Sequence, residues 1–218
     1  MGSRQAPRIM GAPMRKTGGG TGTGPSHGSG DWLTGQLLIA MPSMQDPRFA
    51  QAVICLCAHS ADGAMGLVLN QPLDSFGFDD LLKQLDIAPT PPARAIRMVN
   101  GGPVEAGRGF VLHSPEWSTD GTLPVPGGPE REGAALTASV EVLKAIAEGN
   151  GPRQCVLALG YAGWGPGQLE SEIAANAWLT APADPDILFA SKPQNAWRQA
   201  LAKLKVDPLL LSGAAGHA

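Results

Sequence analysis

Three side chains that could bind a metal or act as nucleophiles stand close together in the first third of the chain. Cys55, Cys57 and His59 alternate with other residues in a segment with a strand-like pattern, and alternate residues of a strand point to one face. Thiolates and imidazole suit zinc, but structural zinc sites usually space their ligands across a tight turn, and a fourth ligand such as Cys155 would have to join them. Because cysteine is among the most buried residue types, the pattern favours core packing, and we predict no metal site and no cofactor.

Nucleophilic catalysis would need a base beside one of these thiols or beside a serine hydroxyl. Besides His59, the expected domain contains His113, whereas His27 and His217 lie near the two ends of the chain. Within residues 31–218, no Gly-x-Ser-x-Gly motif marks a nucleophile elbow, and neither domain histidine follows a known nucleophile pattern. The sequence therefore predicts no catalytic residues, although an enzymatic activity stays open.

Two glycine-rich segments could expose backbone N–H groups to a ligand. Segment 160–167 precedes a predicted helix, where a phosphate could bind, but it matches neither the dinucleotide-binding pattern nor the P-loop. Glu170 and Glu172 in the first turn of that helix would repel an anion. The second segment, 100–103, is typical of a tight turn. Polar residues interrupt the apolar strands in this segment and in the strands near it. The candidate binding residues are therefore Asn70, Gly101, Gly102 and His113.

The hydrophobic pattern predicts the elements that would position these residues. Short apolar runs between turn signals predict strands at 35–40, 52–58, 65–69, 97–100, 109–113, 154–159 and 186–189. An edge strand is predicted at 123–126, because proline is tolerated there. Apolar residues spaced three or four apart predict helices at 78–85, 140–148, 168–179 and 194–204. The helices interrupt groups of adjacent strands irregularly, which indicates an α+β fold with a mixed, largely antiparallel sheet in a single domain.

Three tryptophans have distinct expected roles. Trp178 and Trp197 occupy apolar positions of predicted helices, and we expect Trp178 to be a wedge between a helix end and the sheet. Trp117 lies in the long Pro/Gly-rich stretch 113–133 and is the tryptophan best placed to contact a partner.

Composition separates a tail at 1–30 from a domain at 31–218. The tail has nine glycines, no aromatic residue and four basic residues without an acid, a composition too poor in apolar side chains to fold. The remainder carries 12 basic and 19 acidic residues, a balance of −7. Direct DNA binding is therefore not expected, because a phosphate backbone is recognised by basic patches.

The same composition bears on location. No apolar run approaches the roughly 18 residues of a membrane span, and the tail has no continuous apolar stretch of the kind found in a secretory signal. Three cysteines do not form a disulfide framework. We therefore expect a cytoplasmic protein with reduced thiols and no membrane contact.

Several ordered motifs together resemble the YqgE/AlgH family of bacterial proteins over about residues 33–218. They include Leu38-Ile-Ala-Met-Pro42, Gln45-Asp-Pro47, Gly63-Ala-Met-Gly66, Gly101-Gly-Pro103, Ala158-Leu-Gly-Tyr-Ala162, Gly167-Gln-Leu-Glu170 and Asn176-Ala-Trp-Leu-Thr-Ala-Pro-Ala-Asp184. The resemblance implies an α+β fold around a curved mixed sheet and a cytosolic protein. It implies no established activity, because the family name reflects only a proposed role in regulating alginate gene transcription. The tail and the prolines at 124 and 126 depart from the family pattern.

Two functions follow as hypotheses. The first is a non-enzymatic binding or regulatory module with a protein partner, acting on transcription indirectly if at all. The alternative is an enzyme or small-ligand-binding protein that uses a polar pocket near Asn70, Gly101 and His113. A concave pocket with convergent polar atoms would favour the alternative, and a flat apolar patch near Trp117 would favour the first.

Overall fold

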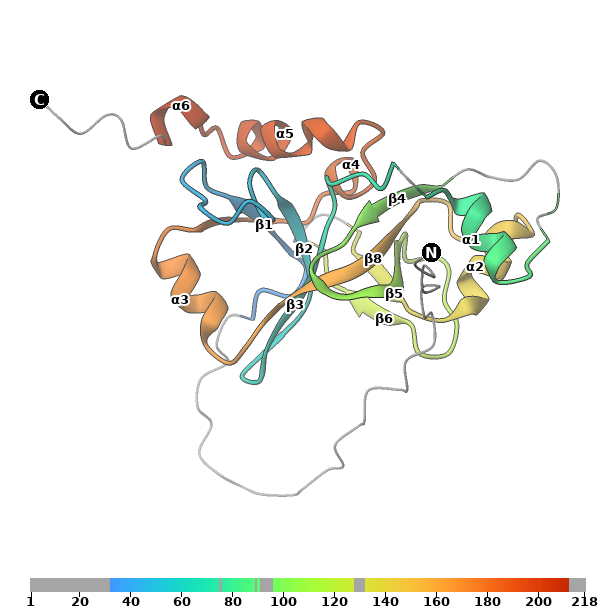
Figure 1. Ribbon diagram of the computed structural model, residues 1–218. Helices are drawn as coiled ribbons and strands as arrows, with labels where there is room; N and C mark the ends of the chain where they lie inside the picture. The colour runs from blue at the N-terminus through green and yellow to red at the C-terminus, as the bar shows by residue number, and fades with distance from the viewer. Residues whose placement is uncertain (1–31, 75, 89, 91–95, 128–131, 212–218) are drawn as a thin grey trace, which may run out of the picture.

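The strands of the chain join into one curled sheet (Figure 1). The computed structural model describes residues 32–211 except 75, 89, 91–95 and 128–131, so the predicted tail at 1–30 lies outside the described residues. The sheet has the order β6-β7-β5-β8-β3-β2-β1-β9, and β4 also pairs with β8. The strands are β1 Gln36–Ala40, β2 Val53–Ser60, β3 Gly63–Val68, β4 Arg97–Asn100, β5 Val104–His113, β6 Leu123–Val125, β7 Ala134–Thr137, β8 Cys155–Trp164 and β9 Trp178–Pro182.

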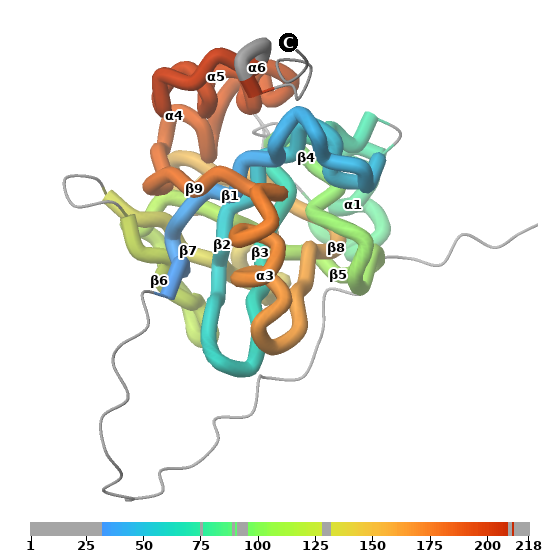
Figure 2. Tube along the Cα trace, turned by 90° about the vertical axis from the view of Figure 1, so that its left-hand side faces the viewer, coloured from blue at the N-terminus to red at the C-terminus, as the bar shows by residue number. Residues whose placement is uncertain are grey.

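The β4–β8 pair is parallel, and the other strand pairs are antiparallel. This arrangement confirms the predicted α+β class with a curved, mixed and largely antiparallel sheet. It also confirms the edge position of the strand predicted at 123–126, which is β6. Figure 2 shows β9, β1, β2 and β3 side by side.

Strand β8 is common to both halves of the sheet. Along one edge it pairs with β5, from His113 opposite Cys155 to Val104 opposite Tyr161. Along the other edge it pairs first with β4 and then, beyond Gly160, with β3. Gly160 has φ +72°, a conformation that glycine adopts without steric cost. The partner on this edge therefore changes at a glycine, within a strand that continues to Trp164.

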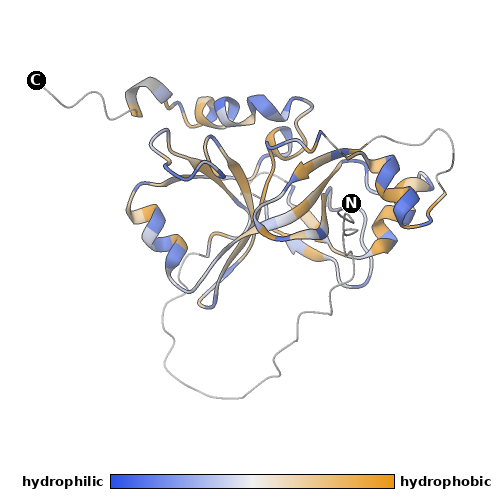
Figure 3. Ribbon diagram, in the orientation of Figure 1, coloured by the Kyte–Doolittle hydropathy of each residue, from blue (hydrophilic) through white to orange (hydrophobic). Residues whose placement is uncertain are grey.

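The helices cover both faces of the curl. They are α1 Phe78–Gln84, α2 Val140–Ala147, α3 Gln168–Ala174, α4 Pro185–Leu188, α5 Ala196–Lys203 and α6 Pro208–Leu211, with a 3₁₀ turn η1 at Pro193–Asn195. The inner face of the sheet forms the largest core cluster, which α4 and α5 close. On the outer face, α1 and α2 pack against one half of the sheet, and α3 packs against the other. The hydropathy colours agree, since the strands are mainly apolar and the helices carry polar residues as well (Figure 3).

The predicted helix at 168–179 is wrong in its second half. Helix α3 ends at Ala174, and Asn176 turns the chain with φ +57°. Trp178 then begins β9, which pairs along its whole length with β1. The apolar spacing of Ile173 and Ala177 continued the helical pattern past the real end, but the backbone N–H and C=O groups that follow bind a neighbouring strand instead. Trp178 is nevertheless buried, as a wedge would be.

Two further predictions need correction. Residues 186–189 are not a strand, because they belong largely to α4, which Asp184 caps by accepting a hydrogen bond from the N–H of Asp186. Asp followed by Pro185 is a helix-start signal that outweighed the apolar run. The strand predicted at 154–159 is longer than expected, because β8 continues through the glycine-rich segment to Trp164. Strand β7 was not predicted at all.

Candidate functional site

The cysteine and histidine side chains of β2 do not share a face. A β-bulge between Leu56 and Ala58 shifts the register against β3, and a bulge changes the alternation of side chains. Cys55 and Cys57 lie in the inner core. His59 instead contacts α3 on the outer face, where its Nε2 lies 2.8 Å from Oε1 of Glu170, and its Nδ1 accepts from the N–H of Leu33. The expectation that all three residues point one way is therefore wrong.

Cys57 lies in an environment that favours its neutral thiol. Its Sγ lies 3.5 Å from the carbonyl oxygen of Cys55. The interaction with Cys55 and the burial of the side chain raise its pKa far above the usual value, and a thiol must lose its proton to bind a metal or attack a carbon. Among the described residues, no group of three or more His, Cys, Asp or Glu side chains is placed to hold a metal ion.

His113 is completely buried, and both its ring nitrogens have protein partners. Nδ1 donates to the carbonyl oxygen of Ser114 at 2.9 Å, which leaves Nε2 to accept from the hydroxyl of Thr137 at 2.9 Å. The Thr137 hydroxyl in turn lies 2.8 Å from that of Thr122. Burial lowers the pKa of His113 below its ordinary value. The ring is thus held neutral within a hydrogen-bond chain.

Trp117 packs beside His113 and does not stand out from the surface. The two rings meet edge to face with centroids 5.4 Å apart. Trp117 is half-buried and also contacts the cluster under α1 and α2. The large apolar side chains that are exposed within the described part of the chain are Trp32, Val104 and Leu123.

Asn70 connects two turns through its side-chain amide. Its Oδ1 accepts from the N–H of Val53, and its Nδ2 donates to the carbonyl oxygen of Gln51, both at 2.8 Å. Gln51 has φ +54°, so the amide supports a residue in the left-handed region, which costs energy for any side chain other than glycine.

Gly101 and Gly102 lie beside the point where the pairing of β8 changes from β4 to β3. The N–H of Gly101 donates to Leu159, and its carbonyl oxygen accepts from Val68. A Cβ at Gly102 would lie 2.2 Å from the carbonyl carbon of Tyr161, and its φ is +147°. Glycine is thus required at 102 for both space and conformation.

The four candidate residues fall into two groups along the sheet. Asn70 and the two glycines are neighbours, since Val68 and Gly101 are hydrogen-bonded. His113 lies opposite Cys155, whereas Gly101 bonds Leu159. Four residues along a strand separate these positions by roughly 13 Å.

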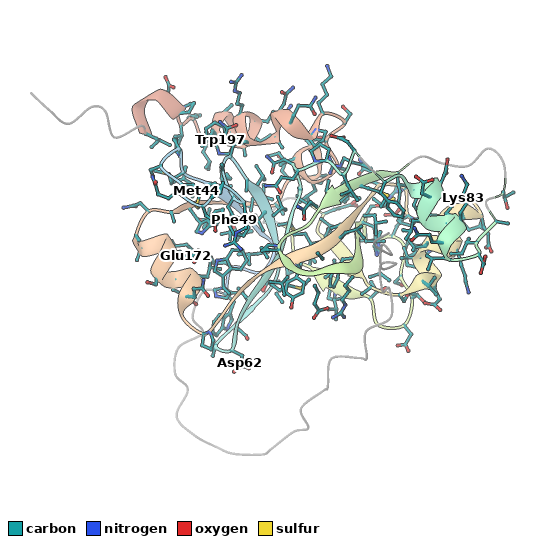
Figure 4. All side chains as sticks on the ribbon, in the orientation of Figure 1. Met44, Phe49, Asp62, Lys83, Glu172 and Trp197 are labelled. Carbon is teal, nitrogen blue, oxygen red and sulfur yellow. The ribbon has the colours of Figure 1, made fainter. Side chains whose placement is uncertain are left out.

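A cleft of about 540 Å³ lies elsewhere, between α3 and the loop that joins β1 to β2. The start of β5, the end of β8 and the start of β9 complete its walls. Figure 4 shows Met44 and Phe49 from the loop on the same side of the molecule as Glu172 from α3, with Lys83 on the opposite side. The lining combines aromatic, polar and charged side chains, which include Arg48, Phe49, Val104, Trp164, Gln168, Glu172 and Trp178.

Glu172 is the centre of the polar contacts in this cleft. Its Oε2 accepts the indole N–H of Trp164 at 2.9 Å and that of Trp178 at 2.8 Å. Its Oε1 accepts from Nε2 of Gln168 at 2.9 Å. The two indole rings meet edge to face at 6.1 Å, and Phe49 meets Trp178 in the same way at 5.9 Å. The carboxylate is therefore fixed by three neutral donors at an aromatic wall.

The other charged side chains among the described residues of the cleft, Asp46 and Arg48, pair with each other. Arg48 donates to both carboxylate oxygens of Asp46, at distances between 2.6 and 3.1 Å. The hydrogen bonds from Arg48 lower the pKa of Asp46. The guanidinium also lies 5.7 Å from the centre of the Phe49 ring.

Sequence reasoning missed this cleft, although it noted its parts. The sequence predicts Trp178 as a structural wedge and Glu172 only as a group that would repel an anion. The available signal was a glutamate flanked at eight and six residues by two tryptophans. That spacing has no meaning until α3 and β9 are known to be separate elements.

Comparison with known proteins gives a consistent result. The family model described as AlgH-like matches residues 37–209. A UPF0301 protein from Azorhizobium caulinodans is 53% identical over 200 residues, covering 88% of this chain and 95% of the relative. One from Rhodospirillum rubrum is 50% identical over 187 residues, covering 86% and 95%.

Two solved structures have similar folds. The solution structure of the AlgH protein from Pseudomonas aeruginosa superposes with a TM-score of 0.67 at 46% identity, covering 89% of this chain and all of that one. The crystal structure of a protein from Corynebacterium diphtheriae gives a TM-score of 0.61 at 22% identity, covering 83% and 91%, and shares the fold. Within the described residues, no helix is long and apolar enough to cross a membrane.

Proposed function

This chain belongs to the AlgH-like family, and from its tryptophan-lined cleft we propose that it is a non-enzymatic binding module with a regulatory role. The observation that carries the proposal is the cleft itself. Three separate segments bring aromatic and polar side chains around one fixed carboxylate, in a space of about 540 Å³. Small-ligand sites have this size and this mixture of apolar walls with a few placed polar groups.

The partner that we propose for regulation is a protein, and the place of action is the cytoplasm. The balance of −7 outside the tail argues against direct DNA binding. An effect on transcription would therefore run through a partner that itself binds DNA or the transcription machinery. A chain without residues 1–30 should bind duplex DNA no better than an unrelated acidic protein in a salt-dependent binding assay.

A retention experiment tests the proposal. Val104 is exposed at the rim of the cleft, and Leu123 is exposed on β6, outside it. The full-length chain, Val104→Lys and Leu123→Lys are immobilised and exposed to native cytosol, and both proteins and small molecules are measured. We expect species that are retained by the wild type and by Leu123→Lys but lost with Val104→Lys. Equal retention by all three would contradict a function of the cleft.

The alternative, an enzyme or ligand site near Asn70, Gly101 and His113, remains a hypothesis. It makes a different forecast for the same experiment. Retention would be lost on replacing Asn70 and kept in Val104→Lys, and retained small molecules would be chemically converted on the immobilised protein.

A further inference from the structure

We infer that the cleft recognises an organic cation, an ammonium or guanidinium group, through Glu172 and the aromatic side chains around it. This inference rests on the proposed binding function and specifies its ligand.

The lining of the cleft carries an excess of acidic side chains. Among the described residues that line it, those with formally charged side chains are Asp46, Arg48 and Glu172. Asp46 and Arg48 form a close pair, so their charges cancel. The three hydrogen bonds described for Glu172 come from two indoles and one amide, which are neutral. The described part of the lining therefore has a formal charge of −1, and it lies on Glu172.

The Glu172 carboxylate has a geometry that suits a cation. A carboxylate offers about four acceptor positions, and the neutral donors described above occupy three. They also fix the group in place, since its two oxygens are held from α3, β8 and the start of β9. A fixed carboxylate with a remaining acceptor position loses little entropy when a cation binds.

Aromatic side chains line the cleft beside this carboxylate. Cations bind favourably over aromatic faces within about 6 Å of the ring centre. The protein already shows this contact, because the Arg48 guanidinium lies 5.7 Å from the Phe49 ring centre. A second guanidinium or an ammonium group that enters the cleft would meet the aromatic side chains that line it and the carboxylate of Glu172.

The charges of the cleft disfavour an anionic ligand. The cation of the lining, Arg48, has its guanidinium on both oxygens of Asp46. An anionic ligand would have to displace Asp46 while approaching Glu172. Like charges in such a site disfavour binding.

The inference is tested on the full-length chain by ¹H–¹⁵N NMR. The indole N–H groups of Trp164 and Trp178 report directly on the carboxylate, and that of Trp197, which donates to the carbonyl oxygen of Ala40, is the internal control. The probes are N-acetyl-lysine methylamide, N-acetyl-arginine methylamide, butylammonium and butylguanidinium. The matched neutral probe is N-acetyl-norleucine methylamide, and N-acetyl-glutamate methylamide is the anionic one.

We expect at least one cation to shift the Trp164 and Trp178 signals and not the Trp197 signal. Glu172→Gln keeps the size of the side chain and an acceptor for the indoles, and should weaken that binding about tenfold or more. Glu148→Gln removes the same charge at the exposed end of α2 and should leave it unchanged. Val104→Lys, which adds a cation at the rim, should also weaken it, so the test does not depend on one variant.

The outcomes separate the two claims. If the capped amino acids bind more tightly, the cation belongs to a side chain of a partner protein. If butylammonium or butylguanidinium binds more tightly, it belongs to a small molecule. Both results support the inference. If no cation binds below about 10 mM, or if the neutral or anionic probe binds equally well, the inference is overturned. The proposed function then still stands if Val104→Lys abolishes retention from cytosol, and it fails separately if that variant retains everything.

Discussion

Replacing Trp178 with phenylalanine should cost more stability than the same replacement at Trp197. The two side chains form a matched pair, because they are 3% and 6% exposed, and each indole donates one hydrogen bond of 2.8 Å. They differ in the acceptor. Trp178 donates to the carboxylate of Glu172, and Trp197 donates to the backbone carbonyl of Ala40.

The expected difference follows from the charge of the acceptor. A hydrogen bond to a neutral group contributes about 0.5–1.5 kcal/mol net, and one to a charged group about 1.5–3 kcal/mol. The loss of ring volume is the same in both variants, so it cancels in the comparison. Trp178→Phe should therefore be less stable than Trp197→Phe by about 1 kcal/mol or slightly more. Trp178→Ala adds a cavity and should cost about 3–5 kcal/mol, against a total of ~5–15 kcal/mol for a typical domain.

Urea unfolding followed by far-UV circular dichroism measures this difference without relying on tryptophan fluorescence. With an m-value of about 1–3 kcal/mol/M, a difference of about 1 kcal/mol separates the two midpoints by roughly 0.3–1 M. Equal midpoints at equal m-values would show that the charge of Glu172 adds nothing to its indole hydrogen bonds. A larger loss for Trp197→Phe would reverse the assignment of Trp178 as the more strongly held ring.

Three other predictions concern His113, Gly102 and the N-terminal residues. Burial lowers the pKa of His113 in the folded state, so the unfolded chain binds more protons. The stability from this group should be fully present above the unfolded pKa of about 6.5 and fall as the pH drops below it, by up to about 1.4 kcal/mol per pH unit. Urea midpoints at pH 7.5 and 5.5 should show a smaller pH dependence in His113→Gln, and an unchanged dependence would contradict the neutral buried ring. Gly102→Ala should destabilise the fold by several kcal/mol. Gly121 also has a positive φ, +81°, but no atom lies within 4 Å of a new Cβ there, so Gly121→Ala should cost about 1–2 kcal/mol for the backbone conformation alone. Similar melting temperatures for the two variants would refute the predicted overlap with Tyr161. Removal of residues 1–30 should leave the melting temperature unchanged in calorimetry, because their composition cannot supply a core. A clear loss of stability would show that they pack against the domain.

The sequence predicted the fold class because most strands are short apolar runs between turn residues, a local signal. It failed where the outcome depends on a distant partner. Strand β9 follows a helical pattern in sequence and becomes a strand because β1 offers an edge to pair with. The bulge in β2, which moves His59 away from the two cysteines, exists only in the register against β3.

The candidate site was harder to predict than the fold for the same reason. His113 and Asn70 were selected because they are polar residues among apolar ones. The structure shows that such residues can be enclosed by their own hydrogen bonds. Glu172 sits on a polar helix surface in the sequence, and its importance comes from two tryptophans that lie on different strands.

The position of β8 in the chain determines when the sheet can form during synthesis. Strands β3, β4 and β5 all precede it, and all three use it as a partner. A growing chain therefore presents edges of these strands without their shared neighbour until Trp164 has left the ribosome. Contacts between distant segments slow folding, and unpaired strand edges favour aggregation. The nascent chain consequently passes most of its synthesis in a state that is open to association with other chains.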